Sequence, residues 1–143
     1  MLNKILEAPV GQVANVLGKV LDGNILLQII EQSTVSPHHF ERKVAISSNQ
    51  LPVIKAQVKF DSRQLPKFIL DELLKKKQGI GSILTQNNIS ATRSVLSLNK
   101  DLGQSKTTRE YQILVDGKVW FTIYEEIRLN NLGSSDNSRT TPR

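Results

Sequence analysis

Cysteine is absent from this chain, and so is any long apolar run. Without cysteine there are no disulfides, no thiolate metal sites and no cysteine nucleophiles. No apolar stretch approaches the ~20 residues that a membrane-spanning helix requires. The N-terminal residues MLNKILEAPVGQVANV lack the continuous apolar segment of a secretion signal. These absences predict a cytoplasmic protein without a membrane span.

Aromatic residues are scarce, at 5% of the chain, whereas basic residues are in excess. Nineteen Lys and Arg against 13 Asp and Glu give a formal net charge of +6. This excess favours an anionic partner, whether nucleic acid, acidic lipid or a small carboxylate or phosphate. The only block of basic residues, at 75–77, closes a predicted helix, where the helix dipole favours cations. No aromatic residues interleave with these lysines, which argues against nucleic acid.

The 143 residues suffice for one domain with a core, and we expect that domain to cover residues 1–129. The last residues, 130–143, have almost nothing to bury and are predicted to form a disordered polar tail. Apolar periodicity and turn residues predict a helix over 10–21, strands over 25–32, 40–47 and 53–60, a helix from Pro66 to Gly79, a short helix over 81–86, and strands over 89–98, 108–115 and 118–129. The expected fold class is α+β, with a six-stranded, mainly antiparallel sheet and helical insertions that enclose a ligand pocket.

Four predicted strands carry one ionised residue each on their apolar face. Since side chains alternate across a strand, these charges point toward the core with their apolar neighbours. They are Arg42, Arg93, Arg109 and Glu125. A charge without a partner in a core costs several kcal/mol, so four on one face predict a shared polar cavity. Three guanidiniums against one carboxylate leave it positive, which favours a small dianionic ligand held by arginine. An internal Arg–Glu network without a ligand is the alternative.

Other chemistry is sparse. His38 and His39 lie in a predicted loop over 35–39, without a suitably spaced carboxylate or cysteine, so we expect no metal site. The segment GIGSIL, residues 79–84, lacks the ending of a phosphate loop and does not follow a strand. Tight packing or contact between its bare backbone and a ligand is expected there instead. No ordered nucleophile and base are present for acyl-transfer hydrolysis.

The series GQVANVL, FERKVAI, VIKAQVKF, LP, GIGSIL, TRSVL, REYQI, DGK and YEE, over about residues 9–129, resembles the chorismate lyase family. The likeness is to its short bacterial, cyanobacterial and plastid members. It implies a cofactor-independent lyase that converts chorismate to 4-hydroxybenzoate and pyruvate for quinone biosynthesis, located in the cytoplasm or the plastid stroma. The resemblance places the family's pocket arginines on Arg42, Arg93 and Arg109, its conserved acid on Glu125, and its pocket glycine on Gly81.

In the lyase hypothesis, Arg42 binds the ring carboxylate of chorismate, and Arg93 or Arg109 binds the pyruvyl carboxylate. Glu125 then hydrogen-bonds the ring oxygen that becomes the phenol, as an acid or an orienting group. Two alternatives stay open. The same superfamily looks shared by ligand-sensing domains of GntR-type transcription regulators, so the chain could be a non-catalytic binding module for small carboxylates. A nucleic-acid binder that uses the net charge of +6 is the third possibility.

Overall fold

The computed structural model describes residues 2–10, 12–20, 25–101, 103 and 105–128. Its elements are α1 (Leu2–Glu7), α2 (Val13–Val20), β1 (Ile25–Ser36), β2 (His39–Ser48), β3 (Leu51–Asp61), η1 (Ser62–Gln64), α3 (Lys67–Leu74), α4 (Ile80–Gln86), β4 (Thr92–Asp101), β5 (Lys106–Val115) and β6 (Lys118–Arg128). The six strands form one sheet in the order β1-β2-β3-β6-β5-β4, and every neighbouring pair is antiparallel. The predicted α+β class and six-stranded sheet are confirmed.

Tight turns join β1 to β2, β2 to β3 and β5 to β6 into hairpins. Asp116 and Gly117 both have positive φ angles, of 52° and 76°, and connect β5 to β6 as the Asp-Gly pair predicts. Asn49 and Gln50 also have positive φ angles and connect β2 to β3. The predicted loop over 35–39 is shorter than expected, because β1 continues to Ser36 and β2 begins at His39. The positive φ of His38, 73°, lets this hairpin close within two residues.

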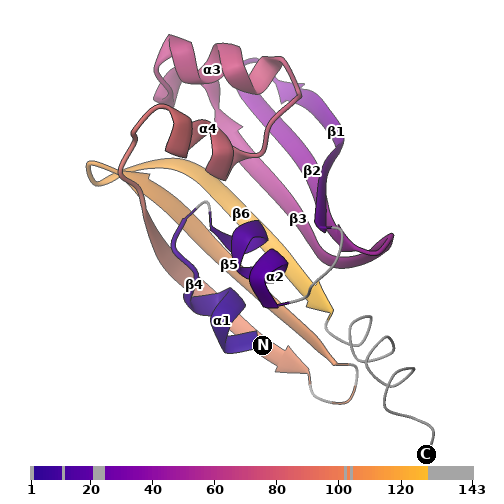
Figure 1. Cartoon of the computed structure of the whole chain (residues 1–143). Helices are drawn as coiled ribbons and strands as arrows, with labels where there is room; N and C mark the ends of the chain where they lie inside the picture. The colour runs from indigo at the N-terminus through magenta and orange to yellow at the C-terminus, as the bar shows by residue number, and fades with distance from the viewer. Residues whose placement is uncertain (1, 11, 21–24, 102, 104, 129–143) are drawn as a thin grey trace, which may run out of the picture.

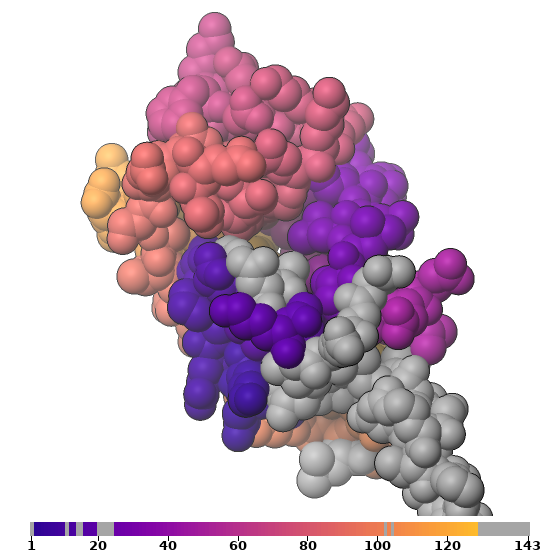
Figure 2. Space-filling model, viewed as in Figure 1, coloured from indigo at the N-terminus to yellow at the C-terminus, as the bar shows by residue number. Residues whose placement is uncertain are grey.

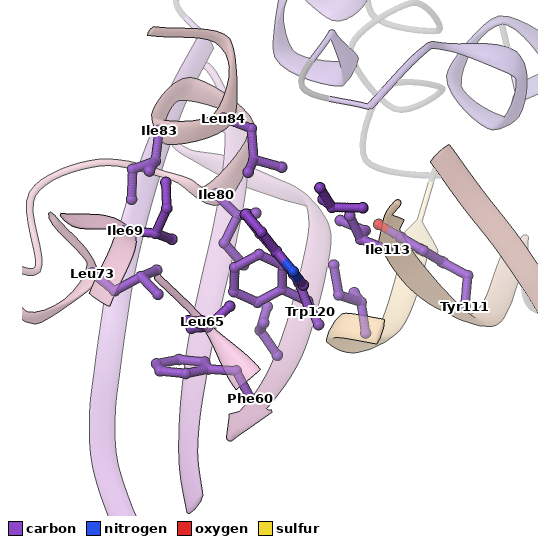
Figure 3. Close-up of a cluster of buried hydrophobic side chains, with 14 residues drawn as sticks. Phe60, Leu65, Ile69, Leu73, Ile80, Ile83, Leu84, Tyr111, Ile113 and Trp120 are labelled. Atoms are coloured by element: carbon purple, nitrogen blue, oxygen red, sulfur yellow. The ribbon is translucent and has the colours of Figure 1, made fainter. Parts of the chain in front are cut away.

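The helices lie in two groups on one side of the sheet (Figure 1). In the first group, α3 and α4 pack on the sheet through a cluster that includes Phe60, Leu65, Ile69, Leu73, Ile80, Ile83, Leu84, Tyr111, Ile113 and Trp120 (Figure 3). In the second group, α1 and α2 pack near the opposite end of the strands through a smaller cluster of Ile5, Leu17, Ile46, Val53, Ile54 and Ile127. The core is therefore divided between the two ends of one sheet face.

Several predicted boundaries are corrected by the structure. Helix α1 was not predicted, because six residues are too few to establish a helical period. Helix α2 begins at Val13 rather than at residue 10, and β4 begins at Thr92 rather than at residue 89. The helix that follows Pro66 ends at Leu74, because Lys76 has a positive φ of 57° and turns the chain out of the helix. Gly79, expected to end that helix, precedes α4 instead.

A further correction concerns the start of β6. A register shift opposite Ile113 and Leu114 inserts an extra residue there, which exposes Val119 and buries Trp120. Val119 therefore leaves the apolar row in which alternation placed it.

The predicted disordered tail, 130–143, lies outside the described residues. None of the helices in the described part of the chain is long and apolar enough to cross a membrane.

Two adjacent leucines test how α3 packs. Leu73 is fully buried, whereas Leu74 is 44% exposed in the same helix. Leu73→Ala should lower the free energy of unfolding by about 2–5 kcal/mol, because the deletion leaves a cavity in the core. Leu74→Ala, which removes the same atoms, should change it by about 0.5 kcal/mol. Urea denaturation followed by circular dichroism measures both, and equal losses would contradict this packing.

Candidate functional site

A cavity of about 460 Å³ lies where the two helical groups meet over the sheet. Figure 2 shows the seam between the α4 region and the N-terminal helices from outside. The lining residues are Val10, Gln12, Val13, Leu27, Val44, Ile46, Ile54, Ala56, Val58, Lys77, Gln78, Gly79, Ile80, Gly81, Ser82, Thr85, Arg93, Tyr111, Ile113, Ile123 and Glu125. Its walls are thus mainly apolar, with a few polar groups from the α3–α4 connection, α4 and the sheet.

Of the predicted site residues, Arg93, Glu125 and Gly81 line this cavity. Gly81 belongs to α4, and its bare backbone forms part of the wall. Arg42 and Arg109 are absent from the described lining, although both point to the same side of the sheet and are buried. The structure therefore brings three of the five predicted residues to the cavity and places two behind its walls.

Arg109 and Glu125 form a buried ion pair. They stand opposite each other on β5 and β6, and Arg109 Nε donates to Glu125 Oε1 at 2.5 Å. The other carboxylate oxygen, Oε2, accepts a hydrogen bond from the Tyr111 hydroxyl at 3.0 Å. Burial, followed by the negative charge of Glu125, raises the pKa of Tyr111 above its usual range, so the phenol stays protonated as a donor. Both oxygens of Glu125 thus have a partner within the protein.

Arg42 is held by backbone carbonyls rather than by a carboxylate. Its Nη1 donates to the carbonyl oxygen of Gln78 at 2.8 Å, and its Nη2 donates to that of Leu73 at 2.9 Å. Its Nε donates to Gln32 Oε1 at 2.7 Å, and the amide nitrogen of Gln32 donates to the same Leu73 carbonyl. Burial lowers the pKa of Arg42 to about 10, and at neutral pH it remains a cation. Arg42 therefore fixes both ends of the α3–α4 connection, which forms one side of the cavity.

Among the described residues, Arg93 is the arginine that lines the cavity. Its Nη1 donates to the carbonyl oxygen of Ala8 at 2.7 Å, and its Cζ lies 4.9 Å from the centroid of the Tyr111 ring. Arg109 lies 4.8 Å from the same centroid, so two cations share one aromatic ring. Arg93 takes part in none of the ion pairs formed by the described residues. Its Nε is buried and has no hydrogen-bond partner among them.

The charge balance of the cavity follows from these contacts. Glu125 neutralises Arg109, so Arg93 contributes the uncompensated positive charge. Lys77 adds a second, exposed cation at the rim. A buried donor on a cation calls for an acceptor, and an anionic group satisfies both its charge and its hydrogen-bonding capacity. The arrangement is therefore suited to hold one acidic group of a ligand inside and to attract it from outside.

Sequence reasoning missed some of the polar groups at this site. Tyr111 was recognised on the inward row of its strand, yet only the register shows that its hydroxyl reaches Glu125. Gln78 lies in the cavity wall, and its side-chain oxygen is buried without a partner among the described residues. Residue 78 sits in a short connection with no periodicity, so no sequence pattern singled it out.

Two further hollows, of about 730 and 600 Å³, lie on the outer face of the sheet. Both are more open than the inner cavity, and neither is lined by a predicted site residue. The larger contains Lys59 and Lys118 together with Glu41 and Asp61, so its charges are mixed. Size alone would favour these hollows, but the buried arginine donor and the predicted site residues favour the inner cavity. Across the described residues, no group of three His, Asp or Glu is placed to bind a metal.

Comparison with known proteins gives a likeness in structure only. No protein-family model and no curated protein sequence matches the chain. The effector domain of PhnF from Mycobacterium smegmatis superposes with a TM-score of 0.57 at 9% identity, covering 82% of this chain and 88% of that domain. For PhnF from the same organism the TM-score is 0.58 at 9% identity, and this chain spans 63% of that protein's length. The third structure is the ligand-binding domain of a protein described as a putative GntR-family transcriptional regulator from Bordetella bronchiseptica. It gives a TM-score of 0.49 at 10% identity and covers 72% of this chain and 85% of that domain.

These similarities agree with the topology. The predicted α+β, chorismate lyase-like fold is confirmed: six antiparallel strands form an open sheet with few helices. The neighbours named above include an effector domain and a ligand-binding domain, and none of them is named as a chorismate lyase. At 9% identity the likeness establishes the fold alone.

The buried pair of Arg109 and Glu125 predicts a strong coupling between the two residues. Glu125→Leu alone should lower the free energy of unfolding by about 3–5 kcal/mol, because it leaves a guanidinium buried without its counter-charge. Adding Arg109→Met removes that charge and should recover part of the loss. Denaturation of the wild type, both single variants and the double variant gives the coupling energy. Strictly additive losses would contradict the pairing.

Proposed function

We propose that this domain binds a small organic anion in the inner cavity and senses it without converting it. The observation that carries the proposal is Arg93, which lines a mainly apolar cavity and has a buried and unpartnered Nε. A hydrogen bond between a charged donor and an acceptor contributes about 1.5–3 kcal/mol. The acid group of a ligand would bind the guanidinium group of Arg93 and supply the missing negative charge.

The position of Arg93 also supports a sensing role. Through its bond to Ala8, Arg93 holds the N-terminal segment on the sheet. The cavity wall includes Val10 and Val13 from that segment, and Gly81 and Ser82 from α4. A ligand on Arg93 would therefore touch both helical groups and tie them together. Binding that bridges two separately packed parts shifts the balance between their arrangements, which is the physical basis of a sensor.

Catalysis of the chorismate lyase type has less support. That hypothesis needs one guanidinium for each carboxylate of chorismate and a carboxyl group available to the ring oxygen. Among the described residues Arg93 is the guanidinium in the cavity wall, and both oxygens of Glu125 are engaged by Arg109 and Tyr111. Likeness to effector domains likewise favours the sensing alternative. The lyase remains the second candidate, and incubation with chorismate tests it.

Ligand binding can be tested with three matched compounds: benzoate, benzyl alcohol and benzylamine. Benzoate should raise the melting temperature and give a measurable affinity by calorimetry, whereas the neutral and cationic analogues should not. Arg93→Gln should weaken benzoate binding by about tenfold or more, because it removes the charged donor. Arg128→Gln makes the same change at an arginine outside the cavity, and it should leave the affinity unchanged. Equal binding of all three compounds would reject an anion site.

Turnover is tested separately by incubating the protein with chorismate and following the absorbance of 4-hydroxybenzoate. We expect no product above the uncatalysed background. Formation of product by the wild type, and its loss in Glu125→Gln, would instead establish the lyase and overturn the sensing proposal.

A further inference from the structure

Tyr111 carries the guanidinium groups of two arginines on its ring, at the wall of the inner cavity. The Cζ atom of Arg93 lies over the ring, 4.9 Å from its centroid, and the Cζ atom of Arg109 lies 4.8 Å from it. The charge of Arg109 is compensated by Glu125 through their ion pair. Within the described structure, the charge of Arg93 is met instead by the ring and by the carbonyl oxygen of Ala8.

The ring of Tyr111 is fixed in its position. Its hydroxyl donates to Glu125 at 3.0 Å, and Glu125 is itself held by Arg109. Only 5% of Tyr111 is exposed, and it stands opposite Val95 of β4 and Ile123 of β6. A buried aromatic ring that is bonded at its hydroxyl end cannot follow a moving partner. It therefore restricts the guanidinium group that lies over it.

A contact with a ring differs from an ion pair in what it leaves available. The attraction between a cation and a ring face depends on the charge of the whole cation, and no N–H donor has to meet an acceptor atom. An ion pair engages the donors and neutralises the charge, as Glu125 does to Arg109. The ring can thus hold Arg93 and still leave its charge and its remaining donors for a ligand.

We propose that Tyr111 is the positioning residue of the anion site, because its ring holds the guanidinium group of Arg93 in the cavity wall. This role rests on the proposed function and adds to it the group that prepares the site for binding. A guanidinium that is already held in place loses less conformational freedom when an acid group binds it. The hydroxyl of Tyr111 has a separate role, since it bonds to Glu125 rather than to Arg93.

The experiment changes the electron density of the ring and keeps its shape. Tyr111 is replaced by phenylalanine, by 3,5-difluorophenylalanine or by 3,4,5-trifluorophenylalanine, none of which has the hydroxyl. Fluorine withdraws electron density from the ring face, so the attraction for a cation weakens along this series. Calorimetric titration with benzoate should show an affinity that falls along the series, by about threefold or more between Tyr111→Phe and the trifluorinated ring.

A second measurement follows the position of Arg93 without any ligand. Nitrogen relaxation of the Arg93 Nε–H group, identified by its loss in Arg93→Gln, gives the order parameter of that group. The order parameter should fall along the same series, which a purely structural role of the ring would not cause. Tyr124 is the matched control, because it is the other tyrosine of the chain, is 47% exposed and lies outside the described cavity lining. The same replacements at Tyr124 should change neither quantity.

The outcomes separate this inference from the proposed function. If benzoate binds the wild type, but either its affinity or the order parameter of Arg93 stays constant along the series at Tyr111, the anion site stands and the positioning role is rejected. An affinity that rises with fluorination also rejects the role. If benzoate does not bind the wild type, the proposed function fails and the role fails with it. Equal melting temperatures along the series verify that each ring is accommodated in the fold.

Discussion

Buried guanidinium groups on one face of the sheet impose the constraint on which the rest of this structure depends. Arg42 and Arg109 are almost fully enclosed, and the neighbouring strands provide only one side-chain acceptor for each, Gln32 for Arg42 and Glu125 for Arg109. Carbonyl oxygens of Leu73 and Gln78 meet Arg42, and the carbonyl oxygen of Leu6 meets Arg109. The helical segments are thus attached to the sheet by directional bonds as well as by apolar contacts. Each bond ends at one particular carbonyl, so it fixes the position of the segment.

Arg93 meets the same constraint only in part, as does Arg109, whose Nη2 is also buried without a partner among the described residues; of the two, only Arg93 lines the cavity. Its bond to Ala8 holds the N-terminal segment, but its Nε remains buried without a partner in the described structure. The two apolar clusters lie toward opposite ends of the sheet, so the cavity between them forms where neither cluster fills the space. A ligand there would complete the solvation of Arg93 and contact both helical groups at once. Recognition and a structural response then arise from one interaction.

Much of the fold was predictable because local rules governed it. Alternation of apolar and polar residues identified the six strands, and the Asp116-Gly117 turn fixed one hairpin. The same alternation found Arg93 and Glu125, since a charge in an apolar row is visible without coordinates. Local rules failed where a short element or an irregular register decided the outcome. Helix α1 has too few residues to show a period, and the extra residue in β6 reverses the facing of Val119 and Trp120.

The sequence by itself determined which charged residues face inward, because the two-residue period of a strand assigns each side chain to a face. Only the tertiary structure decided their roles. β3 separates Arg42 on β2 from Glu125 on β6, a gap of two strand spacings, or ~10 Å, so they cannot pair directly. Arg42 therefore bonds to the α3–α4 connection, and Arg109, directly opposite Glu125, neutralises it. Which acceptor lies within hydrogen-bonding distance depends on register and on helix placement, and both result from packing between segments far apart in the chain.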